Sequence, residues 1–140
     1  MATLSGIKWN SKGIDAGNGD GNAVSIAKKA AKKLGCIVVV SGSTDIITDA
    51  NETFLIHNNA PMLCTNVGMG DVLDAILSVF LSYNDSIKDI AYATAILPIA
   101  AEQATKEYND KPASFCVKTF DNLYKMTDLT LEKYIKMVKI

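Results

Sequence analysis

Residues 36–40 read Cys-Ile-Val-Val-Val, a continuous apolar run rich in β-branched side chains. A run without polar alternation predicts a strand buried on both faces, as in a parallel sheet that helices cover on both sides. An amphipathic helix is expected before it over 23–34, with Asn22 as N-cap and Gly35 as C-cap. Residues 41–45 then form a loop at the strand's C-terminal end, where open α/β sheets bind ligands.

The remainder of the chain continues this strand and helix pattern. A hairpin is expected from strands at 46–48 and 53–56, because Asp-Ala-Asn-Glu at 49–52 supplies turn chemistry. Residues 62–67 are expected to be extended, and the Gly- and Asp-rich residues 13–22 to form a loop. Apolar periodicity predicts helices over about 70–82, 86–109 and 113–125, and a last amphipathic helix from Thr127 to Val138.

This order of elements predicts an α/β fold, with a partial sheet and helices packed around it. The first of the later helices, 70–82, is apolar nearly all round and is expected to be buried. One strand and a hairpin make a thin sheet for so many apolar helices. We therefore expect that part of the sheet is supplied from elsewhere.

Composition limits the class of protein. The 140 residues, 49% of them hydrophobic, suit one domain over 1–140. A net charge of -1 gives no electrostatic support for nucleic acid or an anionic membrane as partner. Three cysteines without CxxC spacing argue against a disulfide framework or a zinc site, and we expect Cys36 and Cys116 to be buried. No signal peptide or membrane-spanning run is recognised, which favours a soluble, cytoplasmic protein.

Residues 66–71 read Asn-Val-Gly-Met-Gly-Asp and are the strongest candidate for chemistry. Two glycines spaced by one residue allow unusual dihedrals and a close approach of the backbone to a ligand. The helix that follows directs its free N–H groups and its dipole at the turn, which creates an anion site suited to phosphate. The pattern leaves two roles open for Asp71, which can stabilise the helix start or act as a general base beside the anion site.

Other polar residues are interpreted as structural. His57 is the one histidine and no second metal ligand lies near it in sequence, so we expect a hydrogen-bonding role. Asp45 and Asp49 are assigned to the hairpin and its turn rather than to a metal.

The stretch 65–71 resembles the Gly-x-Gly-Asp signature of ribokinase-like sugar and vitamin kinases. The wider context looks like hydroxyethylthiazole kinase, and in particular like its C-terminal half. Short matching motifs follow one another in the order of that family, at 38–45, at 56–58 with Pro61, and then at 99–102, 114–115 and 121–124.

The resemblance implies transfer of the γ-phosphate of ATP, with Mg²⁺, to the hydroxyl of 4-methyl-5-(2-hydroxyethyl)thiazole in thiamine salvage. It places the anion hole at Gly68, Met69 and Gly70, with Gly68 also at the substrate. The ATP contacts fall on Ser41 and Gly42, and no metal ligand falls on this chain. Asp71 stands where many members have cysteine, which favours a general base.

Members of that family are about twice as long as this chain. The half without a counterpart provides further strands, thiazole contacts and the acidic residues near Mg²⁺. Expected partners are therefore ATP, a thiazole alcohol, and either further copies of the chain, as in the family's trimers, or an N-terminal half in trans. Two alternatives stay open: a non-catalytic nucleotide-binding or assembly module, and a kinase of another small alcohol, because other kinases of the superfamily share the Asp.

Overall fold

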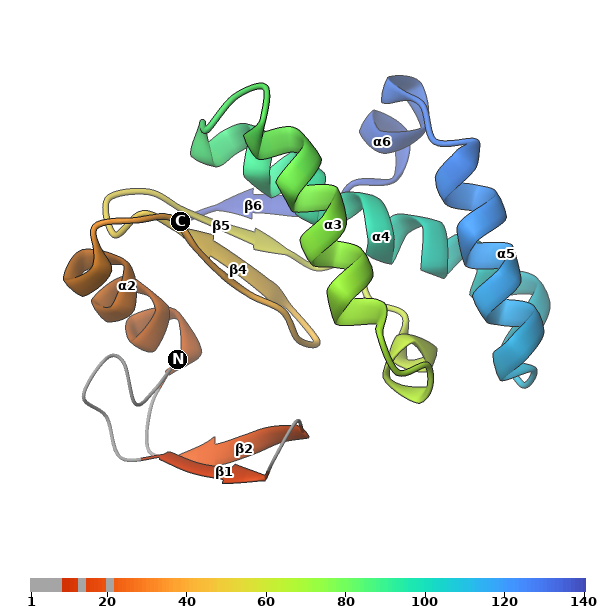
Figure 1. Ribbon diagram of the computed structural model, residues 1–140, viewed down its shortest axis with the longest axis horizontal. Coiled ribbons are helices and arrows are strands. Elements are labelled where there is room, and N and C mark those ends of the chain that lie inside the picture. The colour runs from red at the N-terminus through yellow and green to blue at the C-terminus, as the bar shows by residue number, and fades with distance from the viewer. Residues whose placement is uncertain (1–8, 13–14, 20–21) are drawn as a thin grey trace.

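The computed structural model describes residues 9–12, 15–19 and 22–140 (Figure 1). A four-stranded antiparallel sheet in the order β3-β4-β5-β6 lies at its centre, and a separate antiparallel pair is formed by β1 and β2. The elements are β1 (Trp9–Lys12), β2 (Asp15–Gly19), α2 (Ala23–Leu34), β3 (Val38–Val40), β4 (Asp45–Thr48), β5 (Thr53–Ile56), the 3-10 helix η1 (Pro61–Thr65), α3 (Met69–Leu81), α4 (Ile87–Tyr108), α5 (Pro112–Tyr124), α6 (Asp128–Tyr134) and β6 (Met137–Lys139).

Helices cover both faces of the four-stranded sheet, which confirms the α/β class. Ile46 packs with the buried alanines of α2, whereas its neighbour Ile47 packs with α3 and α4. Adjacent residues of a strand point to opposite faces, so each face contributes to a different apolar cluster. All four residues of β4 are buried for this reason.

The expectation of a parallel pairing for the 36–40 run is wrong within the described sheet. β3 is antiparallel to β4, with Val39 opposite Ile47, and it forms one edge of the sheet. A continuous apolar run requires only that helices cover both faces, and an antiparallel strand between α2 and α3–α4 meets that requirement. Val38 is buried and the other two residues of β3 are partly buried, and the outer edge of the strand has no neighbour among the described strands.

Most of the predicted elements are confirmed close to their expected bounds. Helix α2 has Asn22 as N-cap, whose side chain accepts from the Val24 N–H, and Gly35 as C-cap with φ 66°. The hairpin β4-β5 turns at 49–52, where the Asp49 carboxylate accepts from the N–H groups of Asn51 and Glu52 at 2.8 and 2.7 Å. Helices α3, α4 and α5 match the three longer helices expected after the glycine turn.

The C-terminal segment differs from its prediction. The last helix, α6, ends at Tyr134, and residues 137–139 form β6, which pairs with β5. Val138 therefore lies in a strand opposite Leu55 instead of on a helix. The apolar spacing of 129–138 fits a helix, but the open edge of β5 offers backbone hydrogen bonds to the β-branched end of the chain, and this tertiary pairing decides the outcome.

Three smaller expectations are also wrong. Residues 61–65 form a 3-10 helix instead of an extended segment, because Pro61 favours a helix start and Thr65 Oγ1 donates to the Met62 carbonyl at 2.7 Å. Residues 15–19, expected as loop, pair with β1 as a strand. Cys36 and Cys116 were expected to be buried, but Cys36 is exposed and Cys116 is partly exposed. The predicted features at residues 1–8, 13–14 and 20–21 lie outside the described residues.

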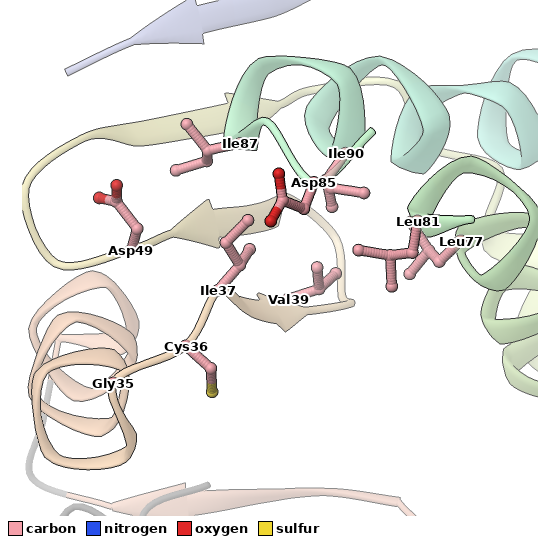
Figure 2. A pocket seen from close by; sticks show the side chains of 10 residues that line it. All are labelled: Gly35, Cys36, Ile37, Val39, Asp49, Leu77, Leu81, Asp85, Ile87 and Ile90. Carbon is pink, nitrogen blue, oxygen red and sulfur yellow. The ribbon is translucent and has the colours of Figure 1, made fainter. Parts of the chain in front are cut away.

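Helix α3 is less buried than its composition predicts. Met69, Leu73 and Leu77 are buried, whereas Val79 and Leu81 are 57% and 50% exposed. An open cavity of about 610 Å³ lies between α3, α4 and the face of β3 (Figure 2). No helix in the described part of the chain is both long and apolar enough to cross a membrane.

Candidate functional site

The sheet topology brings the loop after β3 and the connector after β5 to the same end of the sheet. β3 and β5 are both antiparallel to β4, which lies between them, so β3 and β5 run in the same direction. Loop 41–44 leaves the end of β3, and the connector 57–60 leaves the end of β5 towards η1 and the glycine turn (Figure 1). Thr44 Oγ1 lies 3.4 Å from His57 Nδ1, so the two segments are in contact and His57 has the expected hydrogen-bonding role.

The two glycines of the turn, Gly68 and Gly70, have different backbone conformations. Gly68 is the N-cap of α3 with φ 95°, a left-handed conformation that side chains disfavour. Its carbonyl accepts the first helical hydrogen bond, from Val72 N–H at 3.1 Å. Gly70 lies inside the helix without a positive φ, and a Cβ built there meets nothing within 4 Å. Only Gly68 therefore uses the unusual dihedrals expected of both, whereas Gly70 leaves open space beside the first turn.

Asp71 lies beside this turn and is exposed. Its Oδ2 is 3.9 Å from the position that a Cβ on Gly68 would take. No side chain caps the start of α3, so Asp71 does not act as a hydrogen-bonding cap, although its charge is favourable in the first turn. The first N–H groups of α3 have no partner within the helix and point towards the turn. The helix start thus combines N–H donors, open space and a carboxylate.

The β3-β4 loop presents Ser41 and Gly42 to solvent. The Gly42 N–H donates to Asp45 Oδ1 at 2.8 Å, so this amide is used within the loop and is not free for a phosphate. Asp45 is 6% exposed. Burial raises the pKa of Asp45 to about 6, although the hydrogen bond from Gly42 acts in the opposite direction. Asp45 therefore shapes the predicted ATP loop, a more specific role than the hairpin assignment made from the sequence.

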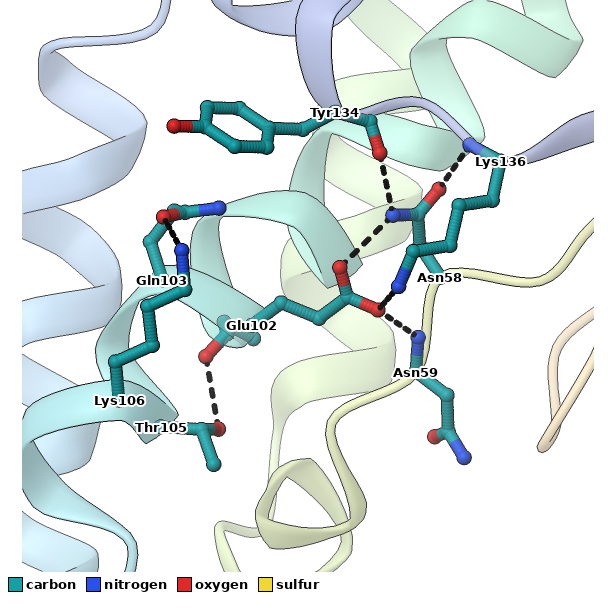
Figure 3. Close-up of polar contacts among 9 residues, drawn as sticks. Asn58, Asn59, Glu102, Gln103, Thr105, Lys106, Tyr134 and Lys136 are labelled. Atoms are coloured by element: carbon teal, nitrogen blue, oxygen red, sulfur yellow. Dashed lines mark hydrogen bonds and ion pairs between the residues drawn. The ribbon is translucent and has the colours of Figure 1, made fainter.

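A buried amide holds the connector that leads to the glycine turn (Figure 3). Asn58 is 1% exposed, and its Nδ2 donates to Glu102 Oε2 and to the Tyr134 carbonyl, both at 2.9 Å. Its Oδ1 accepts from the Lys136 N–H at 2.8 Å. One side chain thus joins the end of β5 to α4 and to the segment between α6 and β6.

Glu102 completes this network with its second oxygen. Glu102 Oε1 accepts from the Asn59 N–H and from Lys136 Nζ, both at 2.8 Å. Burial raises the pKa of Glu102, but the hydrogen bonds from Lys136, Asn59 and Asn58 outweigh burial and hold the pKa below its usual value. Sequence reasoning assigned no role to Asn58 or Glu102. The available signal was a lone carboxylate directly after the buried alanines of α4.

The described residues contain no cluster of metal-ligating side chains. In 9–12, 15–19 and 22–140, no group of three or more His, Cys, Asp or Glu side chains is placed to hold a metal ion. The start of a helix can bind phosphate through its N–H groups, and a carboxylate beside it can accept a proton.

Known proteins resemble this chain in sequence and in fold. Residues 1–129 match the sequence model of the "Hydroxyethylthiazole kinase family". The chain belongs to this family. A hydroxyethylthiazole kinase from Lactiplantibacillus plantarum is 34% identical over 140 residues, which cover 98% of this chain and 53% of the relative. One from Limosilactobacillus fermentum is 35% identical over 131 residues, which cover 94% of this chain and 51% of the relative.

A solved structure of a hydroxyethylthiazole kinase protein from Pyrococcus horikoshii OT3 has the same fold. The TM-score is 0.80 at 29% identity, and the match covers 84% of this chain and 46% of that chain. The hydroxyethylthiazole kinase resemblance and the partial α/β sheet expected from the sequence are therefore confirmed. This chain spans about half the length of the curated hydroxyethylthiazole kinases that it matches.

Asp45→Asn should stabilise the chain in a pH-dependent way. The pKa of Asp45 is about 6 in the folded state, against an ordinary value of 3.8. Between these two pH values the carboxyl group keeps its proton in the folded chain and loses it in the unfolded chain. Stability from this group is complete below pH 3.8 and is lost as pH rises through 6. Urea unfolding should show a gain of up to about 3 kcal/mol at pH 7.5 and little gain near pH 4.

The matched control for this prediction is Asp49→Asn in the same hairpin. The backbone N–H of Glu52 lowers the pKa of Asp49, so neutralising Asp49 should bring no gain at pH 7.5. An equal gain from Asp45→Asn at both pH values would contradict the account of a buried, ionised Asp45.

Glu102→Ala should destabilise the fold by roughly 2 kcal/mol, because it leaves the buried Asn58 amide and the Asn59 N–H with fewer partners. Urea unfolding at neutral pH measures this loss. Glu107→Ala is the control on the same helix, since Glu107 pairs with Lys118 at the surface, and its effect should stay within about 0.5 kcal/mol. Equal losses from the two variants would exclude a special role for the network.

Proposed function

We propose that this chain supplies the ATP-phosphate site and the general base of a hydroxyethylthiazole kinase. The observation that carries the proposal is the Asp71 carboxylate, which lies beside the open glycine turn at the start of α3. A helix N-terminus is suited to phosphate, and a carboxylate near it can accept the proton of an attacking alcohol.

The proposed reaction uses these groups in a single displacement. The hydroxyl oxygen of 4-methyl-5-(2-hydroxyethyl)thiazole attacks the γ-phosphorus of ATP, and the bond from that phosphorus to the ADP oxygen breaks. Asp71 takes the hydroxyl proton, so the products are the thiazole phosphate ester, ADP and a protonated Asp71. The N–H groups at Gly68, Met69 and Gly70 stabilise the charge of the transferring group, which is the main task in phosphoryl transfer.

The second nucleotide contact in the proposal comes from the loop after β3. Ser41 is exposed at the end of the sheet from which the connector to the glycine turn also leaves, and it can donate its hydroxyl to a phosphate oxygen. The Gly42 N–H is held by Asp45, so Gly42 contributes by leaving space for the nucleotide. Asp45 acts here as a positioning residue, because it fixes the backbone of the loop.

The 140 residues alone should be a weak or inactive kinase. They span about half of the length of the related enzymes. We expect activity only when the other half is present, joined or supplied in trans, with trimer formation as a further requirement. The chain spans only about half of the length of its relatives, and this also supports the second candidate function. That candidate is a module that binds nucleotide or assembles with partners without turnover.

The test of the proposed base is Asp71→Asn in a chain complemented with the unmatched half of the Lactiplantibacillus plantarum kinase. Thiazole-dependent ADP release should fall by roughly 10²–10⁴-fold, as expected for loss of a general base. ATP affinity should stay equal or rise, because a negative charge beside the phosphates is removed. Asp74→Asn, an exposed carboxylate on the same helix, is the control and should change neither quantity.

A second variant tests the phosphate site without relying on turnover. Gly70→Ala should fold normally, since the new Cβ meets no protein atom and alanine favours a helix. It should weaken ATP binding by at least roughly tenfold, measured by calorimetry, because the methyl group occupies the space beside the first turn. Unchanged ATP binding by Gly70→Ala, or full kinase activity from the uncomplemented chain, would contradict the proposal. ATP binding without turnover after complementation would favour the second candidate.

A further inference from the structure

We infer that Asp45 binds a phosphate of ATP directly, as a neutral carboxylic acid that takes up one proton from solvent when the nucleotide binds. The inference deepens the proposed function and rests on it for the identity of the ligand, because that function places ATP at Ser41 and Gly42. Besides holding the backbone of the loop, the carboxyl group of Asp45 then contacts the ligand itself.

The two carboxyl oxygens of Asp45 have different surroundings. Oδ1 accepts from the Gly42 N–H at 2.8 Å, whereas Oδ2 has no hydrogen-bond partner in the described part of the chain. Every fully buried side-chain oxygen among the described residues has a partner, so Oδ2 must be reached from outside, although the residue as a whole is only 6% exposed. Asp45 is thus an almost buried carboxyl group with one open oxygen whose hydrogen-bonding capacity is unused.

The open oxygen lies at the end of the sheet where the proposed ATP site is. Asp45 is the first residue of β4 and follows loop 41–44 directly. Residues two apart in a strand share a face, so Asp45 projects from the same face as Ile47, which packs with α3 and α4. Helix α3, which begins at the glycine turn, covers that face. Oδ2 therefore opens beside the Gly42 backbone, on the side of the sheet that carries α3.

The charge of Asp45 has no ionic partner in the described part of the chain. Burial raises the pKa of Asp45 to about 6 and the Gly42 N–H lowers it, with no charged side chain among the causes. Strands β3 and β5 carry no ionisable residue. The ionisable residues on the elements around β4 are Lys28, Lys29, Lys32 and Lys33 of α2, Asp71 and Asp74 of α3, Lys88, Asp89, Tyr92, Glu102, Lys106, Glu107 and Tyr108 of α4, and His57 after β5.

An ionised Asp45 opposes a phosphate at this position. A carboxylate has only acceptor sites, so it offers a phosphate oxygen no hydrogen bond and repels its charge. A protonated Asp45 keeps an acceptor for the Gly42 N–H and gains an O–H donor at Oδ2. A nearby negative charge raises the pKa of a carboxyl group, and burial already favours the neutral form. ATP binding therefore draws a proton from solvent onto Asp45, and the new O–H donates to a phosphate oxygen.

Proton uptake is measured by calorimetric titration of the 140-residue chain with ATP in buffers of different ionisation enthalpy. At pH 7.5 the parent chain should take up about one proton more per bound ATP than Asp45→Asn. This excess should disappear near pH 5, where Asp45 already carries its proton. Asp49→Asn is the matched control, because Asp49 lies in the turn at the other end of β4, and this variant should keep the excess.

ATP affinity separates a ligand contact from a purely structural role. Asparagine keeps an acceptor for the Gly42 N–H and places an N–H donor where the neutral acid has its O–H. Asp45→Asn should therefore bind ATP up to roughly thirtyfold more tightly than the parent at pH 7.5, the ratio of ionised to neutral Asp45 at that pH. Near pH 5 the two chains should bind ATP equally. Asp45→Ala has neither group and should bind ATP more weakly than Asp45→Asn at both pH values.

Several results would overturn the inference. Equal proton uptake by the parent and Asp45→Asn would assign the proton to another group, for example His57. An ATP affinity of Asp45→Asn that is unchanged or lower at pH 7.5 would leave Asp45 with a structural role only. A loss of affinity that requires Mg²⁺ would instead identify the ionised carboxylate as a metal ligand.

The inference and the proposed function fail on different results. ATP binding and thiazole-dependent turnover without proton uptake by Asp45 would remove the inference alone. Proton uptake that depends on Asp45, without ADP release after complementation, would keep the inference and remove the proposed kinase reaction. A parent chain that does not bind ATP would overturn both.

Discussion

The side chain of Asn58 is the constraint on which the arrangement of the site depends. It is almost fully buried, and its amide joins the end of β5, helix α4 and the segment before β6 by three hydrogen bonds. A buried amide without partners is costly, so these three segments are held in one relative position. The connector after Asn58 leads through η1 to Gly68 at the start of α3, so the network fixes one end of the segment that reaches the glycine turn.

The fold could be read from the sequence where local signals and packing agree. Asn22, Gly35 and the 49–52 turn use capping and turn chemistry that depends only on nearby residues, and the structure follows them. The last strand could not be read in this way, because the pairing of Val138 with Leu55 joins residues far apart in the chain. The burial of α3 was overestimated for a related reason: its apolar side chains exceed what this chain's own elements cover.

The candidate site was predictable in its parts but not in its connections. The glycine turn and the strand-end loop follow from residue types. Strand β4 lies between β3 and β5 and is antiparallel to both, which explains why the loop after β3 and the connector to the glycine turn leave the same end of the sheet. Sequence patterns did not reveal that the Gly42 N–H donates a hydrogen bond to Asp45. They also did not reveal that Glu102 holds the connector through its hydrogen bonds with Asn58 and Lys136. Those contacts depend on burial and on long-range packing, which single-residue patterns do not encode.

The central claim is that the loop after β3 and the start of α3 form a single phosphate site. Amide chemical-shift mapping of the 140-residue chain during titration with ATP tests it most directly. The account predicts shifts at Ser41 and Gly42 together with Met69, Gly70 and Asp71, following one binding curve, while the amides of α6 stay unchanged. Shifts confined to one of the two segments, two different binding curves, or shifts only elsewhere would contradict it.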